Sequence, residues 1–270
     1  MRDPLPAQAG EGEGGGRPAV DDFYDQLAPF YHLIFADWDE SIARQGRALG
    51  AILREQWPGH RSALYVSCGI GTQAIGLALD GFWVKASDTS AGSIERARGE
   101  AAQRGLVIEF SICDMRNAFG CHGTGFDVVL SADNAIAHLL DDADILRALE
   151  SMHACLRPGG GCLITVRDYD QERRGTNIVK PYGVRTEDGK RYLLLQVWDF
   201  AGELYDLTLY VIEEDLATGV ATTHTMRSRY YAIGTDRLLA LMRQAGFERV
   251  QRLDDVFLQP VLVGTRPAGL

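Results

Sequence analysis

The sequence predicts an α/β fold, with a mostly parallel sheet, helices on both faces and an inserted antiparallel β meander. Three observations predict it. Between residues 62 and 168, short apolar runs alternate with segments of helical periodicity, as in βα units joined by right-handed crossovers. A glycine-rich loop directly follows the first apolar run. From about residue 170 to 232 the pattern changes to three β-rich runs separated by turn residues.

The flanking segments complete the expected organisation. Residues 1–18 are rich in Gly, Pro and Glu and lack the apolar core of a signal peptide, so we expect a disordered tail. Residues 19–270 form one domain. Within it, helices in 19–60 cover the active site, and the β-rich insertion of 170–232 acts as a lid over the substrate.

Several boundaries have recognisable signals. Asp39 or Ser41 is expected to cap the long N-terminal helix. Near the end of the chain, Thr235 is expected as the N-cap of a last helix and Gly246 as its C′ residue. Two neighbouring strands then close the sheet as a hairpin.

The charge balance disfavours a nucleic-acid partner. The 270 residues include 27 Lys and Arg against 37 Asp and Glu, a formal net charge of −10, whereas phosphate neutralisation needs a basic face. No apolar run approaches the roughly eighteen residues of a membrane span. We therefore expect a cytoplasmic protein that acts on a small molecule, with no nucleic acid and no membrane among its partners.

The five cysteines are an odd number without a CxxC pair. This pattern predicts neither a disulfide framework nor a zinc site. Cys113, Cys155 and Cys162 lie in apolar or helical surroundings and are expected to be small core residues. No His and carboxylate pair stands at ligand spacing, so no metal is expected.

Gly69, Gly71 and Ala74 form a G-x-G-x-x-A loop between a strand and a helix. Such a loop lets a ligand approach the backbone, and the helix N-terminus adds amide donors. Asp88 ends the next strand, at a spacing that suits a carboxylate binding two ribose hydroxyls. Together these features predict a nucleoside site. The alternative is a tight turn plus an Asp that caps the following helix.

Asp114 ends the third strand. Its carboxylate can accept a hydrogen bond from an adenine amino group, while Met115 covers the ring. A loop Asp making an Asx turn is the simpler interpretation. Acceptors at three successive strand ends fit the rule that ligands bind at the carboxyl edge of open α/β sheets. These residues alone do not separate a nicotinamide dinucleotide from S-adenosylmethionine.

The segments SCGIGT, Asp88, CDMR, FDVVLSADN and LRPGG occur in an order and spacing that resemble the class I S-adenosylmethionine-dependent methyltransferases. The resemblance implies a Rossmann-like, seven-stranded sheet whose last strand is antiparallel. It also implies methyl transfer, with S-adenosyl-L-methionine as cofactor and S-adenosyl-L-homocysteine as product. The cofactor-binding residues that it implies are Ser67, Cys68, Gly69, Gly71, Asp88, Thr89, Asp114, Met115 and Ala132.

One position departs from that pattern. The family usually carries an acidic residue where this chain has Tyr65. In the family that carboxylate supports the loop amides and the amino group of the cofactor's methionine. We expect Tyr65→Asp to preserve or tighten cofactor binding.

A closer resemblance, to the glycine/sarcosine N-methyltransferases, rests on DNAIAHLLDD, RPGG, TVRDYD and RYYA. It implies that Arg167 holds the carboxylate of an amino-acid-like amine. It also implies catalytic roles for Asn134 and Tyr24. Tyr31 and Arg44 would contact the cofactor. The further residues that would contact the substrate are Tyr169, Tyr210 and Tyr230. It also permits a homo-oligomer.

Three alternatives stay open. His138 could act as a general base in an O-methyltransferase that acts on a natural-product hydroxyl. The chain could also be a nucleoside-binding module without catalysis. Arg167 could instead form a surface ion pair with Asp168, Asp170 or Glu172, and the tyrosines could be ordinary sheet packing.

Overall fold

A computed structural model describes residues 20–269, and the expected disordered tail of residues 1–18 lies outside them. A seven-stranded sheet forms the centre, with the strand order β10-β11-β5-β4-β1-β2-β3. The strands are β1 (Ser62–Tyr65), β2 (Trp83–Asp88), β3 (Glu109–Ile112), β4 (Phe126–Ser131), β5 (Leu156–Thr165), β10 (Glu248–Leu253) and β11 (Val261–Thr265). Only β11 runs antiparallel to its neighbours, β5 and β10. The predicted α/β fold and the closing strand pair are confirmed.

Helices flank this sheet. They are α1 (Val20–Leu27), α2 (Trp38–Gln56), α3 (Thr72–Leu79), α4 (Ala91–Gln103), α5 (Ala118–His122), α6 (Asp142–Cys155) and α7 (Thr235–Gln244), with 3-10 turns η1 (Tyr31–Ile34), η2 (Met115–Asn117) and η3 (Ala135–His138). No helix in this part of the chain is long and apolar enough to cross a membrane. The core lies on both sides of the sheet, in two clusters of buried apolar side chains.

Two expected helix caps were wrong, while Gly246 has the expected left-handed backbone just beyond α7, at φ +94°. The N-cap of α2 is Asp37, whose carboxylate accepts a hydrogen bond from the Glu40 amide. Neither Asp39 nor Ser41 caps it, because both already lie inside the helix. The N-cap of α7 is Gly234, since Thr235 is already helical.

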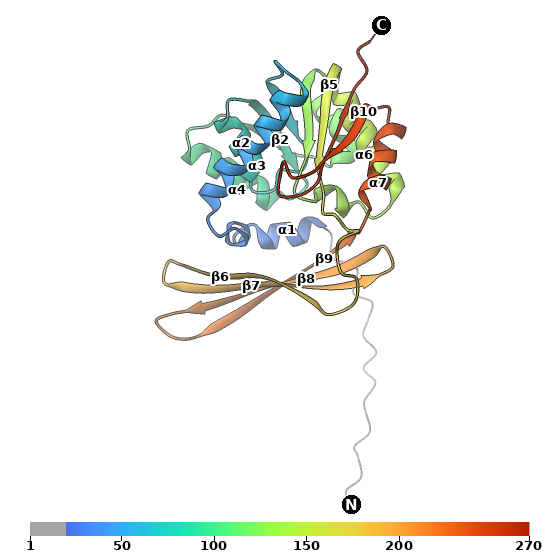
Figure 1. Ribbon diagram of the computed structural model, residues 1–270. Helices are drawn as coiled ribbons and strands as arrows, with labels where there is room; N and C mark the ends of the chain where they lie inside the picture. The colour runs from blue at the N-terminus through green and yellow to red at the C-terminus, as the bar shows by residue number, and fades with distance from the viewer. Residues whose placement is uncertain (1–19, 270) are drawn as a thin grey trace, which may run out of the picture.

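The insertion is a separate four-stranded antiparallel sheet of β6 (Ile178–Glu187), β7 (Lys190–Ala201), β8 (Leu204–Asp215) and β9 (Ala221–Tyr231). The antiparallel meander was predicted correctly, but with three strands. The edge strand β6 was missed because Pro181 and Gly183 interrupt its pattern, and the pairing register shifts between these two residues. In Figure 1, α1 lies between this sheet and the central α/β layers.

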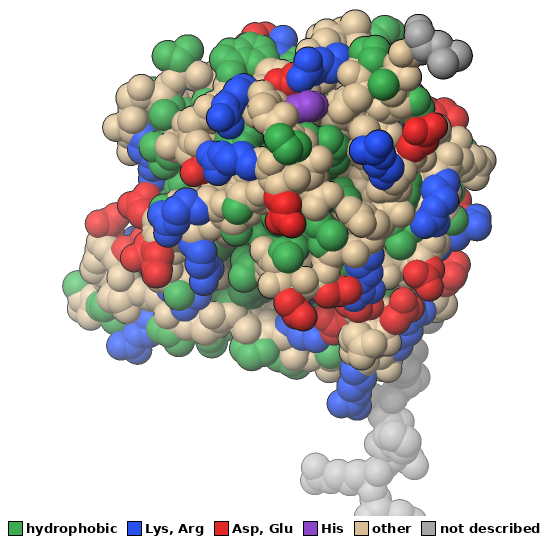
Figure 2. All heavy atoms as spheres, turned by 45° about the horizontal axis from the view of Figure 1, so that its top comes forward, with side chains coloured by type: hydrophobic (Ala, Val, Ile, Leu, Met, Phe, Trp, Pro, Cys, Tyr) green, Lys and Arg blue, Asp and Glu red, His purple; other side chains and the backbone are tan. Residues whose placement is uncertain are grey.

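Charged side chains of both signs are scattered over the face of the molecule shown in Figure 2. Figure 2 shows Lys and Arg side chains interspersed with Asp and Glu side chains on one face. Many such side chains form ion pairs, for example Arg54 with Asp80 at 2.6 Å. Exposed pairs of this kind contribute little to stability.

Candidate active site

A cavity of about 610 Å³ lies over the carboxyl ends of the parallel strands. This is the place where open α/β sheets bind ligands. The expected cofactor residues that line it are Tyr31, Ser67, Cys68, Gly69, Asp88, Thr89, Asp114, Met115 and Ala132. We call it the nucleoside cavity, and its size suits a ligand of nucleoside dimensions.

The glycine loop borders this cavity and leaves no room for side chains. Gly69 has φ +52°, and a Cβ there would lie 3.2 Å from Cε1 of Tyr31. Gly71 has φ +94°, and its Cβ would crowd Ile75 of α3 at 3.0 Å. Gly71 therefore serves the packing of the turn and, unlike Gly69, does not line the cavity.

Asp88 fixes the loop against the next βα turn. One carboxylate oxygen accepts a hydrogen bond from the Gly69 amide at 2.8 Å, and the other accepts from the Ser90 amide at 3.0 Å. The carboxylate thus connects the loop after β1 to the start of α4 and lies at the cavity wall. The expected ribose-binding position and the alternative structural role of Asp88 are compatible in this geometry.

Asp114 has a partner that the sequence analysis did not identify. Arg116 donates to both of its carboxylate oxygens, at 3.0 and 3.1 Å from Nε, and also pairs with Asp144 of α6 at 2.6 Å. Burial favours the protonated form of Asp114, but the hydrogen bonds and charge of Arg116 outweigh it and lower the pKa of this carboxyl. Asp114 is therefore ionised and fixed at the cavity wall.

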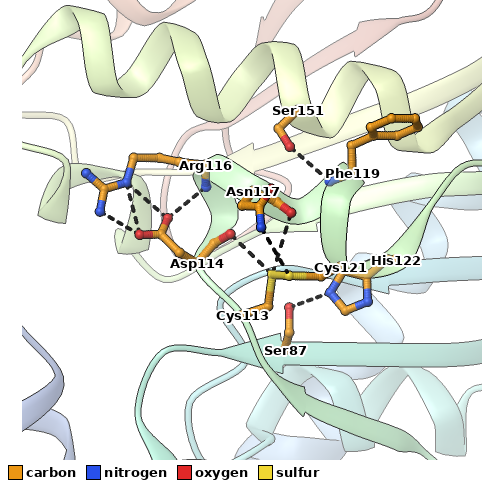
Figure 3. The surroundings of a disulfide bond; sticks show 9 residues. All are labelled: Ser87, Cys113, Asp114, Arg116, Asn117, Phe119, Cys121, His122 and Ser151. Atoms are coloured by element: carbon orange, nitrogen blue, oxygen red, sulfur yellow. Dashed lines mark hydrogen bonds and ion pairs between the residues drawn. A yellow bond between two sulfur atoms is a disulfide. The ribbon is translucent and has the colours of Figure 1, made fainter.

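A disulfide between Cys113 and Cys121 lies beside this ion pair, as Figure 3 shows. Cys113 is buried as expected. The expectation of no disulfide was wrong, because η2 and α5 fold back and bring Cys121 to it. Cys68, Cys155 and Cys162 are free and buried. Among residues 20–269, one group has potential metal ligands close together, formed by Cys113, Cys121 and His122. Its two sulfur atoms are bonded to each other in this structure.

A second cavity, of about 260 Å³, shares Tyr24, Tyr31 and Asp133 with the first. We call it the acceptor cavity. Its remaining lining residues come from the N-terminal helices, from the ends of β4 and β5 and from the inner face of the second sheet, and they are Phe23, Leu27, Ile34, Phe35, Asn134, Arg167, Tyr182, Gln196, Tyr205, Leu207 and Tyr230. The three shared side chains form the boundary between the two cavities.

Arg167 is the cationic group of the acceptor cavity. Its guanidinium carbon lies 4.9 Å from the ring centroid of Trp198, and its buried Nε has no hydrogen-bond partner. Burial disfavours the charged form, but the neighbouring tyrosines and Asp133 outweigh burial and raise the pKa of Arg167. The guanidinium is therefore charged and has a donor to spare for an anion.

The alternative surface ion pairs of Arg167 do not form. Asp168 pairs with Arg252 at 2.6 Å, and Glu172 pairs with Lys180 at 2.6 Å. No ion pair joins Asp170 to Arg167 within the described chain. The cation is thus directed at the cavity and is not neutralised at the surface.

Asn134 organises the wall between Arg167 and the aromatic side chains. Its left-handed backbone, at φ +66°, is a conformation that Asn tolerates better than most residues. The side-chain carbonyl accepts from the Arg167 amide at 3.1 Å, and the amide nitrogen donates to the Tyr169 hydroxyl at 2.8 Å. Tyr169 is buried behind Asn134, bonded to Tyr205 at 3.1 Å, and does not line the cavity itself.

Tyr24 and His138 meet in the nucleoside cavity. The Tyr24 hydroxyl and His138 Nε2 are 2.8 Å apart, and the Tyr230 hydroxyl is 3.5 Å from that of Tyr24. Burial lowers the pKa of His138 to about 3, so its imidazole is neutral at physiological pH. Aromatic rings therefore border both cavities where they adjoin.

Two expected site residues lie elsewhere. Arg44 is exposed on α2 and lines neither cavity, while its neighbour Gln45 faces inward and accepts from Gln73 at 2.9 Å. Tyr210 lies on the outer face of the second sheet, because positions 205, 207, 209 and 211 of β8 are the buried ones. The inner-face tyrosine that lines the acceptor cavity is Tyr205.

Asp133 and Tyr182 are the main residues that the sequence analysis missed. Tyr182 lies on β6, the strand that was not predicted. Asp133 lies two residues after the end of β4, and its position at the carboxyl edge of the sheet was a usable signal.

The strand order and the cavity at its carboxyl edge define a Rossmann-like α/β protein with a nucleoside-sized site. Residues 63–160 match the family model described as "Methyltransferase domain". This part of the chain therefore resembles a methyltransferase domain, in agreement with the resemblance seen in the sequence.

Individual proteins that resemble this chain are also methyltransferases. The chain is 31% identical over 145 residues to the glycine/sarcosine N-methyltransferase of Parasynechococcus marenigrum, across 53% of this chain and 50% of that protein. It thus spans about half the length of the curated relatives that it matches. The sugar N-methyltransferase KedS8 from Streptoalloteichus has a similar fold, with a TM-score of 0.75 at 24% identity over 97% of this chain and all of that one. CalS10, an amino pentose methyltransferase from Micromonospora solved with bound SAM, also has a similar fold. Its TM-score is 0.72 at 20% identity, over 84% of this chain and 92% of that one.

Proposed function

We propose that the protein transfers a methyl group from S-adenosylmethionine to a small amine that carries a carboxylate. The observation that carries this proposal is the pair of adjoining cavities with different chemistry. The nucleoside cavity offers Asp88, Asp114 and the glycine loop, and the acceptor cavity offers Arg167 among aromatic side chains. A donor and an acceptor bound in the two cavities would meet at their shared boundary.

The residues present fit the cofactor. Asp88 would accept from the ribose hydroxyls, Met115 would cover the adenine, and the Gly69 backbone allows close approach. The tyrosines at the boundary place electron-rich rings where the cationic sulfonium would lie. Bound S-adenosylmethionine supplies an electrophilic methyl group. The methyltransferase-domain match and the SAM-bound structure of CalS10 support this cofactor.

Positioning is the main catalytic contribution that we assign to this chain. Bound in this way, the cofactor would supply its methyl carbon to the nitrogen lone pair of the acceptor, and its sulfur would keep the electron pair of the broken carbon–sulfur bond. The resulting ammonium then releases a proton to water. Arg167 would hold the carboxylate, while Asn134 and the tyrosine hydroxyls orient the amine in line with the methyl group.

The second sheet would serve as the lid over the acceptor. Tyr182, Gln196, Tyr205, Leu207 and Tyr230 from this sheet line the acceptor cavity. Their contribution supports enclosure of the reacting groups away from bulk water. It also supports an enzyme over a module that only binds a nucleoside, because such a module needs no second cavity.

The O-methyltransferase alternative is less well supported. A hydroxyl acceptor needs a general base, and His138 lines the nucleoside cavity. A base whose conjugate acid has a pKa of about 3 gains little from taking a proton at neutral pH. A neutral amine needs no such base, so the site favours nitrogen.

The direct test is a titration with S-adenosylmethionine and S-adenosylhomocysteine, followed by a turnover screen over amino acids, amines without a carboxylate and phenols. We expect binding of both nucleosides and a mass gain of one methyl group on carboxylated amines. Binding without turnover would leave only the nucleoside-binding module, and methylation restricted to phenols would establish the alternative reaction.

A further inference from the structure

A bound S-adenosylmethionine would carry a positively charged α-ammonium at the end opposite its adenine. Asp88 ends β2 and Asp114 follows β3 on one side of the sheet, so the amino-acid end would fall toward the ends of β1 and β4. A buried cation needs an anionic or strongly accepting partner.

Among the residues that the structure describes, five aspartates line the nucleoside cavity, and four of these have strong partners. Asp88 accepts from two main-chain amides, and Asp141 accepts from the Asp144 amide at the start of α6. Asp114 and Asp144 are both paired with Arg116.

The fifth, Asp133, has a weaker environment. It accepts one long hydrogen bond, from Gln259 Nε2 at 3.3 Å, and forms no ion pair within residues 20–269. Its side chain is open to solvent. Desolvation by the surrounding atoms raises the pKa of this carboxyl, and the attraction of Arg167 opposes that rise. A cationic ligand group would compensate the charge.

The end of β1 provides no such anion. Tyr65 is fully buried, and its hydroxyl donates to Gln73 Oε1 at 3.4 Å. Burial first, and then the charge of Asp133, raise the pKa of Tyr65 well above its usual value, so the side chain is neutral. The carboxylate at the end of the neighbouring strand, β4, is therefore the one next to this site.

We propose that Asp133 binds the α-ammonium of the cofactor, so that β4 supplies the anion for which β1 has only a neutral tyrosine. The inference rests on the proposed function. Because Asp133 also lines the acceptor cavity, the competing assignment is a contact with the acceptor amine alone.

The test compares two ligands by calorimetric titration. S-adenosylhomocysteine carries the ammonium, and 5′-methylthioadenosine lacks the whole amino-acid part. Asp133→Asn is expected to weaken S-adenosylhomocysteine binding about ten- to hundredfold, as for loss of a charge-assisted hydrogen bond, and to leave 5′-methylthioadenosine unchanged. Asp255→Asn is the matched control, because Asp255 also has a left-handed backbone, at φ +60°, and lines neither cavity.

Two results would overturn the inference. One is unchanged S-adenosylhomocysteine affinity in Asp133→Asn, with only the KM of the acceptor raised. The other is an equal loss for both ligands, which would indicate local misfolding. Failure of the unaltered protein to bind either nucleoside would instead refute the proposed function.

Discussion

The side-chain carbonyl of Asn134 accepts a hydrogen bond from the main-chain amide of Arg167 at 3.1 Å, which ties the end of β4 to the end of β5. The same amide side chain holds the Tyr169 hydroxyl. One buried residue thus sets the place of the proposed carboxylate-binding arginine relative to the aromatic wall.

Asn134→Ala should therefore reduce turnover more than it reduces cofactor binding. Loss of both hydrogen bonds leaves buried polar groups unsatisfied and costs about 1–3 kcal/mol for each group. We expect a drop in kcat of at least about tenfold, with S-adenosylhomocysteine affinity within about threefold of the original. Asn177→Ala is the control, because Asn177 shares the left-handed backbone and lies outside both cavities. Equal effects of the two changes would contradict the assigned role.

Arg167→Ala should act selectively on acceptors that carry a carboxylate. We expect their kcat/KM to fall about 100-fold, because a charge-assisted bidentate contact is lost, while amines without a carboxylate change little. Arg174→Ala, which removes an exposed guanidinium near Phe200, should leave both classes unaffected. A uniform loss over all acceptors would mean that Arg167 acts through the fold and does not bind the acceptor.

His138 makes stability depend on pH in the acid range. Its pKa is about 3 in the folded protein and near 6.5 in the unfolded chain. Between these values the unfolded chain binds more protons, so this histidine lowers stability as pH falls from about 6.5 toward 3. Urea unfolding at pH 7 and pH 5 should show a smaller loss for His138→Gln than for the original protein, by up to about 2 kcal/mol. Identical losses would refute this.

The Cys113–Cys121 disulfide should stabilise the turn that carries Asp114. A cross-link over so short a loop contributes on the order of 2–3 kcal/mol. We expect a reductant to lower the melting temperature of the original protein and to have no effect on Cys121→Ser. If the original protein melts identically with and without reductant, the disulfide does not contribute.

If Asp133 takes the place of a carboxylate at the end of β1, an acidic residue introduced at that end should restore cofactor binding to Asp133→Asn. Tyr65→Asp introduced into Asp133→Asn returns one anion to this end of the cavity. We expect the double variant to regain at least about tenfold of the lost S-adenosylhomocysteine affinity. A double variant that folds but binds as weakly as Asp133→Asn would argue against exchange of the two positions.

The α/β architecture could be predicted because the periodicity of apolar residues and the glycines at turns are local signals in the sequence. Side-chain direction was harder. Tyr205 and Tyr210 both lie in β8, and only the parity of the strand decides which of them faces the cavity. On α2, the neighbouring residues Arg44 and Gln45 point in different directions. Arg44 is exposed to solvent and Gln45 is buried.

Other features depend on how neighbouring segments fold onto one another, which the local sequence pattern does not show. The Cys113–Cys121 bond needs η2 and α5 to turn back on β3, which the spacing of two cysteines does not reveal. The edge strand β6 was hidden by Pro181 and Gly183, and Tyr182 lies between them.

The acceptor cavity draws on a part of the chain that the nucleoside cavity does not use. Every described residue that lines the nucleoside cavity lies from position 24 to position 144, whereas Arg167 and five other lining residues of the acceptor cavity lie beyond β5. Exchange of residues 170–232 with another insertion would thus leave every nucleoside contact in place. Chimeras joined at the ends of β5 and β9 are a direct route to altered acceptor choice with unaltered cofactor affinity.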